Sequence, residues 1–132
     1  MTLDFDRMPS LVQPRFKGGQ GEAETRIFQD GMGKILRLTP DGKAAPGNPF
    51  ASRGGVSAQI WTYGHRNVLG LEFDADGNLW ASEMGPKGGD ELNLITKGKN
   101  YGWPKASNGS HYDGSEIPDH RTGDDYEAPK VW

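Results

Sequence analysis

Apolar residues recur in short stretches along this chain, where they alternate with polar residues or form brief apolar runs. Alternation with a period of two is typical of half-buried β-strands, in which successive side chains point to opposite faces of a sheet. No stretch shows the 3.6-residue period of an amphipathic helix. The pattern therefore predicts an all-β fold with short strands over residues 33–39, 58–63, 71–73, 79–83 and 91–95.

The turns between these strands differ in how clearly the sequence marks them. Asp74-Ala75-Asp76-Gly77-Asn78 separates two apolar stretches, and Asp, Asn and Gly tolerate the left-handed dihedrals that a hairpin turn needs. This segment predicts a hairpin over residues 71–83. Residues 1–32 show no regular pattern, and residues 15–26 are polar and rich in glycine, as in a mobile or crossing loop. We therefore expect an irregular N-terminal segment over residues 1–32.

The composition is poor in apolar residues for a chain of 132 residues. Hydrophobic residues make up 33%, against roughly 45–50% in a typical globular domain, while 20 glycines and 9 prolines favour turns. Strand-turn-strand units of this kind recur in the blades of β-propellers, and closure of a propeller takes at least about four blades. The sequence therefore predicts one or two blades of a propeller. A small β-sandwich with irregular ends is the alternative.

Charge and composition exclude several classes of function. The net charge of −3 is spread along the chain without a basic block, so there is no electrostatic footprint for nucleic acid. The absence of cysteine excludes disulfides and thiolate metal sites. No apolar run approaches the roughly 18 residues of a membrane span. The N-terminus lacks the form of a secretory signal, so we expect either a cytosolic protein or an export signal on a segment outside this chain.

Four segments, in order, resemble a known family. They are residues 33–50 (GKILRLTPDGKAAPGNPF), 63–70 (YGHRNVLG), 82–93 (SEMGPKGGDELN) and 98–104 (GKNYGWP). They closely resemble the glucose/sorbosone dehydrogenase family, soluble sugar dehydrogenases that use pyrroloquinoline quinone and calcium on a six-bladed β-propeller. The resemblance implies that residues 33–132 form a partial propeller domain of about two blades with long loops.

The resemblance assigns cofactor contacts to Arg66, Asn67 and Met84. Pyrroloquinoline quinone is a planar quinone with three carboxylates, and a guanidinium fork can pair with a carboxylate or a quinone oxygen. Arg66 would also act in catalysis by stabilising charge on the quinone oxygen. Asn67 supplies a donor and an acceptor, and Met84 stands where relatives often carry Gln or His. From the residues alone, a surface ion pair for Arg66 and a turn position for Asn67 remain the alternative.

The resemblance also assigns two calcium sites. Backbone carbonyls are common calcium ligands, and the family's catalytic calcium is held by carbonyls at the position of Gly85 and Pro86. Asp90 matches an acidic residue near the active centre, where it would orient a basic partner. Glu91 would hold a second, structural calcium with a carbonyl from the loop at Tyr101. For Asp90 and Glu91 the alternative is a solvated acidic edge that discourages strand aggregation.

The implied function is oxidation of the C1 hydroxyl of aldoses to the lactone, with a sugar as substrate and an external electron acceptor. The family's catalytic histidine belongs to a motif upstream of the matching segments, so His65 does not inherit that role and the chain is expected to be inactive alone. His111 and His120 lie in polar loops and are expected to be exposed. Family members are usually exported, which implies a periplasmic or secreted location. A non-catalytic, calcium-stabilised propeller module that binds carbohydrate or a protein partner is the alternative.

Overall fold

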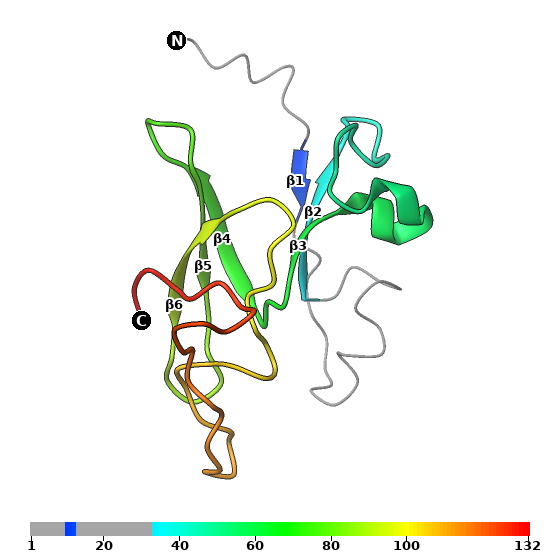
Figure 1. Ribbon diagram of the computed structural model, residues 1–132. Helices are drawn as coiled ribbons and strands as arrows, with labels where there is room; N and C mark the ends of the chain where they lie inside the picture. The colour runs from blue at the N-terminus through cyan, green and yellow to red at the C-terminus, as the bar shows by residue number, and fades with distance from the viewer. Residues whose placement is uncertain (1–9, 13–32) are drawn as a thin grey trace.

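The structure, a computed structural model, describes residues 10–12 and 33–132. In this part of the chain six strands form two three-stranded antiparallel sheets, which lie beside each other in Figure 1. The first sheet has the order β1-β2-β3 and the second has the order β4-β5-β6. Two short 3₁₀ helices precede β3, and no described helix has the length and apolar character needed to cross a membrane. The elements are β1 (Ser10–Val12), β2 (Lys34–Leu38), η2 (Ala51–Arg53), η3 (Gly55–Gln59), β3 (Ile60–Tyr63), β4 (Val68–Phe73), β5 (Leu79–Glu83) and β6 (Glu91–Ile95).

The second sheet confirms the predicted hairpin. Strands β4 and β5 pair from Phe73 opposite Leu79 to Val68 opposite Glu83, with an irregularity between Val68 and Gly70. One carboxylate organises the turn, because Asp74 accepts hydrogen bonds from the backbone N–H groups of Asp76 and Asn78 and from the Trp80 indole at 2.9 Å. The indole is the largest of the causes that lower the pKa of Asp74 to about 2.

A shared apolar core joins the two sheets. Ile35 of β2 packs in one cluster with Val68, Leu79, Ala81 and Ile95 of the second sheet and with Tyr101. Strand β5 buries alternate positions, as the two-residue period predicts, whereas in β4 only Val68 is fully buried. The connection from β3 to β4 crosses between the sheets, and the predicted functional segment around Arg66 lies on it.

Several boundaries differ from the prediction. The third strand begins at Ile60 rather than at residue 58, because residues 55–59 form η3, which begins at two consecutive glycines with positive φ, Gly54 at its N-cap and Gly55 as its first residue. Strand β4 begins earlier than predicted, at Val68, which is buried opposite Glu83. The irregular segment 1–32 contains strand β1, which pairs with the edge of β2, a long-range contact that local sequence does not reveal. The predicted loop over residues 15–26 lies outside the described residues.

The expectation that His111 and His120 are exposed was wrong. Both side chains are partly buried. His120 Nε2 lies 3.1 Å from the backbone carbonyl of Tyr101, and its Nδ1 is buried without a partner. The cause is a tertiary contact across 19 residues of sequence, which a local reading of a polar loop does not include.

Candidate cofactor site

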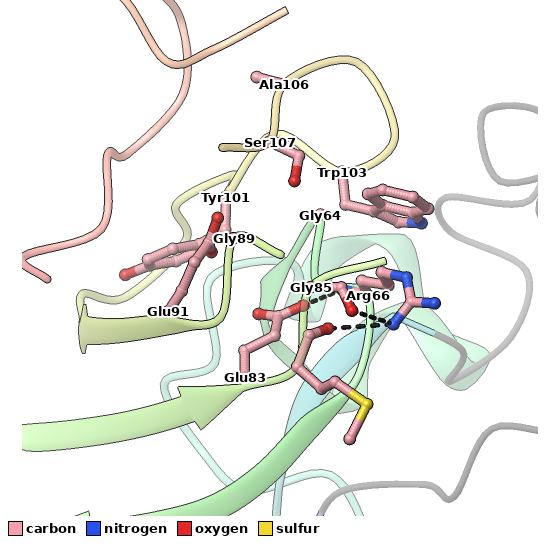
Figure 2. Close-up of a pocket in the computed structure, with 11 residues that line it drawn as sticks. Gly64, Arg66, Glu83, Gly85, Gly89, Glu91, Tyr101, Trp103, Ala106 and Ser107 are labelled. Atoms are coloured by element: carbon pink, nitrogen blue, oxygen red, sulfur yellow. Dashed lines mark hydrogen bonds between the residues drawn. The ribbon is translucent and has the colours of Figure 1, made fainter. Parts of the chain in front are cut away.

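A small pocket lies where the β3–β4 connection, the end of β5, the start of β6 and the loop after residue 100 meet (Figure 2). These segments come from three of the four resembling motifs, which are far apart in the sequence but adjacent in the fold. Two carboxylates and one guanidinium line it, together with glycines and aromatic rings. The lining residues are Gly64, Arg66, Glu83, Met84, Gly85, Gly89, Glu91, Tyr101, Trp103, Ala106 and Ser107.

Arg66 is the cation of the pocket. Its Nη1 donates to the backbone carbonyls of Met84 and Gly85, both at 3.1 Å, and Figure 2 shows both hydrogen bonds. Its Nη2 donates to the Tyr112 hydroxyl at 3.1 Å. The guanidinium carbon lies 5.5 Å from the centre of the Trp103 ring, within cation–π range. The guanidinium is therefore held in one orientation beside an aromatic face.

Glu83 lines the pocket, although the sequence reasoning did not select it as a site candidate. Its side chain is only 5% exposed and accepts hydrogen bonds from the backbone N–H groups of Arg66 and Asn67. His65 Nδ1 lies 3.1 Å from the other carboxylate oxygen. A signal was present, because Glu83 continues the buried face of β5 that Leu79 and Ala81 define.

Asn67 and Met84 lie beside each other next to the pocket. The Met84 N–H donates to the Asn67 carbonyl at 2.9 Å, and the Asn67 amide nitrogen lies 4.0 Å from the Met84 sulfur. Met84 lines the pocket and is 42% exposed, whereas Asn67 is not one of the lining residues. Asn67 and Met84, which the resemblance assigned to the cofactor together with Arg66, thus form the rim on one side of the pocket.

The Gly85-Pro86 turn is buried and closely packed. The Gly85 N–H donates to the Asp90 carboxylate at 3.0 Å, so Asp90 holds the turn while lying outside the pocket lining. A Cβ atom built on Gly85 would lie 2.5 Å from the Gly89 carbonyl oxygen and closer still to that of Gly88. Only glycine fits here, and its carbonyl is directed to Arg66.

Glu91 brings a second carboxylate to the pocket. Burial and then the neighbouring Glu83 carboxylate raise its pKa above the ordinary value. Its Oε2 accepts a hydrogen bond from Asn93 Nδ2 at 3.2 Å. Asn93 is fully buried, and its Oδ1 has no hydrogen-bond partner. This local excess of oxygen acceptors has the chemistry that a hard cation such as calcium prefers.

Tyr101 contributes its ring and its backbone rather than a free hydroxyl. The hydroxyl donates to the Leu94 carbonyl at 2.7 Å and accepts from the Thr96 N–H at 2.8 Å. Its ring stacks on His65 with centroids 4.5 Å apart. The Tyr101 carbonyl faces His120 Nε2. In the described residues no three Asp, Glu or His side chains converge as a metal cluster, so a calcium ion here would need backbone carbonyls among its ligands.

The tryptophans differ in their relation to the pocket. Trp103 lines it, whereas the Trp80 indole is bonded to Asp74 in the hairpin turn. Trp61 lies between Arg37 and Lys97, at 5.0 and 5.7 Å from its ring centroid. Trp103 is therefore the one of these three that can report directly on ligand binding.

Comparison with known proteins agrees with the arrangement of these segments. The family model for glucose/sorbosone dehydrogenases matches residues 16–132. The aldose sugar dehydrogenase YliI of Escherichia coli is 49% identical over 89 residues, which are 67% of this chain and 24% of that protein. Quinoprotein glucose dehydrogenase B of Acinetobacter calcoaceticus is 48% identical over 88 residues, 67% of this chain and 18% of that protein. The chain thus spans about a quarter or less of these relatives.

Solved structures give the same relationship. The apo form of the soluble aldose sugar dehydrogenase from Escherichia coli matches with a TM-score of 0.80 and 37% identity, over 95% of this chain and 37% of that chain. The PQQ-bound form of the aldose sugar dehydrogenase from Streptomyces coelicolor matches with a TM-score of 0.59 and 46% identity, over 76% of this chain and 28% of that one. The all-β prediction of a partial propeller is confirmed, and the β-sandwich alternative is set aside. The chain belongs to the glucose/sorbosone dehydrogenase family.

Proposed function

We propose that this chain supplies part of the cofactor site of a pyrroloquinoline quinone-dependent aldose dehydrogenase that oxidises the sugar C1 hydroxyl to the lactone. The observation that carries the proposal is the fixed Arg66 guanidinium, which lies beside Trp103 and the Gly85 carbonyl in one pocket. A planar, anionic ligand matches a guanidinium next to an aromatic face. The names of the relatives, a quinoprotein and a PQQ-bound enzyme, support the same ligand.

The residues present fit such a ligand. Arg66 would pair with a carboxylate or quinone oxygen, Trp103 would offer a stacking face, and Asn67 and Met84 would close the rim. When bound, pyrroloquinoline quinone supplies the two-electron acceptor for the sugar. Gly85 and Pro86 would offer backbone oxygens to the catalytic calcium, with Asp90 holding the turn through the Gly85 N–H. Glu91 and the Tyr101 carbonyl would serve the second calcium, and the unpartnered Asn93 Oδ1 adds an oxygen to this group.

Turnover requires more than these residues. His65 is buried and engaged at both ring nitrogens, so it is not available as a base for the sugar hydroxyl. We therefore expect that this chain with cofactor, calcium and glucose reduces no acceptor dye. The whole protein would pass its electrons to an external acceptor and act in the periplasm or outside the cell, as its family resemblance implies.

Replacing Arg66 by lysine is expected to weaken binding of pyrroloquinoline quinone about tenfold, because lysine keeps the charge but loses the bidentate fork. The measurement is quenching of tryptophan fluorescence on titration with the cofactor, with calcium present and then chelated. Trp103→Phe identifies the signal from the pocket. Arg53→Lys, the same change in η2 outside the pocket lining, is the matched control and should leave the affinity unchanged.

Saturable, calcium-dependent quenching that is lost with Trp103→Phe supports the proposal. Equal affinity of Arg66→Lys and the unaltered chain contradicts the role of Arg66. Absence of any binding, with calcium present, favours the alternative of a non-catalytic module, which a carbohydrate-binding assay on the same chain would then have to support.

Glu91→Gln is expected to stabilise the chain near neutral pH without calcium. Because burial raises the Glu91 pKa, the folded state holds its proton to higher pH than the unfolded state. Stability therefore falls as the pH rises from the ordinary carboxyl value through the raised one. The substitution should remove this decline and also abolish the rise in Tm that calcium gives the unaltered chain. Thermal unfolding between pH 4 and 8 tests both effects, and Glu72→Gln, at an exposed position of β4, is the matched control. An unchanged response to calcium in Glu91→Gln would exclude Glu91 as a ligand.

A further inference from the structure

We propose that Glu83 is a positioning residue, whose buried carboxylate sets the conformation of residues 65–67 and thereby aims the Arg66 guanidinium across the pocket. This inference deepens the proposed function and rests on it for the identity of the ligand. Glu83 itself is not proposed to touch the substrate.

The first observation is that three consecutive residues direct their N–H groups to one carboxylate. Glu83 Oε1 accepts from the backbone N–H of Arg66 and, at 2.9 Å, from that of Asn67. Glu83 Oε2 lies 3.1 Å from His65 Nδ1. Charged acceptors give stronger hydrogen bonds than neutral ones, and this carboxylate is almost completely shielded from solvent. The turn that carries Arg66 is thus folded around the Glu83 side chain.

The second observation concerns the far side of His65. Its Nε2 lies 2.9 Å from the hydroxyl of Thr62, a fully buried residue of β3. A carboxylate can only accept hydrogen bonds, so His65 Nδ1 carries the hydrogen. In the neutral imidazole Nε2 then accepts from the Thr62 hydroxyl. The imidazole is also stacked on Tyr101, with an interplanar angle of 21°. His65 therefore links Glu83 to the interior of the first sheet.

The third observation is that the strand end carrying Glu83 fixes both ends of Arg66. The Glu83 carboxylate holds the backbone N–H of Arg66, and the carbonyls of the next two residues, Met84 and Gly85, hold its guanidinium (Figure 2). The Met84 N–H also donates a hydrogen bond to the Asn67 carbonyl, which joins the same two segments. Displacing residues 65–67 would therefore move the cation relative to the carbonyls with which it lines the pocket.

The conservative substitution Glu83→Gln gives a specific test. The side-chain carbonyl of the glutamine can still accept from the backbone N–H groups of Arg66 and Asn67. Its NH₂ group, however, would place a hydrogen against the Nδ1–H of His65. We expect His65 to change tautomer, so that Nδ1 accepts and Nε2 donates to the Thr62 hydroxyl, which can accept. Long-range ¹H–¹⁵N NMR of the chain should therefore show Nδ1–H in the unaltered protein and Nε2–H in Glu83→Gln.

Binding experiments separate positioning from general stability. Glu83→Gln should keep the affinity for pyrroloquinoline quinone within about threefold, whereas Glu83→Ala should lose about tenfold or more. Thr62→Val alone should change the affinity for pyrroloquinoline quinone only slightly. Glu83→Gln combined with Thr62→Val should no longer keep the affinity that Glu83→Gln keeps alone, since His65 Nε2–H then has no acceptor at residue 62. Such non-additivity is the signature of one coupled network. Hydrogen exchange of the Arg66 and Asn67 amides should accelerate in Glu83→Ala and in the double variant, with the amides of the β4–β5 hairpin tip unaffected.

The outcomes distinguish the two proposals. If the tautomer and the Arg66 and Asn67 amides respond as expected but the unaltered chain binds no pyrroloquinoline quinone, the positioning role stands and the proposed ligand is wrong. If His65 keeps its tautomer in Glu83→Gln, or the amides of residues 66 and 67 stay protected in the double variant, the positioning role is overturned. Because Glu83→Gln and Thr62→Val preserve side-chain volume, the test does not depend on Glu83→Ala folding.

Discussion

Gly85→Ala is expected to destabilise the chain by about 3 kcal/mol and to abolish cofactor binding. The added Cβ would meet the carbonyl oxygens of Gly88 and Gly89, which are backbone atoms without a rotamer to relieve the clash. Relief requires the turn to move, and this displaces the Gly85 carbonyl from Arg66 and the Gly85 N–H from Asp90. Urea unfolding and titration with pyrroloquinoline quinone measure the two losses.

Gly77→Ala is the matched control for this prediction. Gly77 has a φ of 83° in the hairpin turn, and a Cβ there would meet no atom within 4 Å. The substitution should cost about 1 kcal/mol through backbone strain alone and leave the cofactor affinity unchanged. If Gly85→Ala cost no more than Gly77→Ala and bound the cofactor normally, the close approach of residues 85, 88 and 89 could not be what shapes the pocket.

The parts of the fold that the sequence predicted are those that local chemistry determines. The hairpin around Asp74 follows from turn residues within one five-residue segment, and β6 has the predicted boundaries, because alternation alone specifies a half-buried strand. Strand β1 was not predicted, since it pairs with β2 more than twenty residues later. The burial of His120 was missed for the same reason.

The candidate site was predicted in part. Arg66, Met84, Gly85, Glu91 and Tyr101 were identified from motif order, and the fold brings all five to one pocket. Glu83 was overlooked because a glutamate at a strand end is ordinarily a solvated residue, and its burial depends on backbone donors sixteen and seventeen residues earlier. The position of Glu83 on the same face as Leu79 and Ala81 was the available signal. A charged residue that continues a buried face is worth treating as a candidate for a polar network.

Ile35→Ala is expected to destabilise the chain by about 2–5 kcal/mol, a large part of the roughly 5–15 kcal/mol that stabilises a typical domain. Ile35 is fully buried and, in the described core cluster, it is the buried member that the first sheet contributes. Its truncation should therefore weaken the contact between the sheets more than the interior of either one. The connection that carries His65, Arg66 and Asn67 crosses between the same two sheets, so the site depends on that contact.

The expected signature is a loss of cooperativity as well as of stability. In Ile35→Ala, unfolding followed by Trp103 fluorescence should precede unfolding of the β4–β5–β6 sheet followed by circular dichroism. The reason is that the β3–β4 connection, which lines the pocket, joins the two sheets, whereas the β4–β5 hairpin forms from local contacts. Ile35→Val should cost only about 0.5–1.5 kcal/mol, and Leu69→Ala, at a position 62% exposed on β4, should remain within about 0.5 kcal/mol. Coincident transitions in Ile35→Ala would mean that the sheets hold together without this side chain. The alignment of Arg66 by Glu83 would then be a property of the local turn, whereas separate transitions would make it a product of the docking of one sheet against the other.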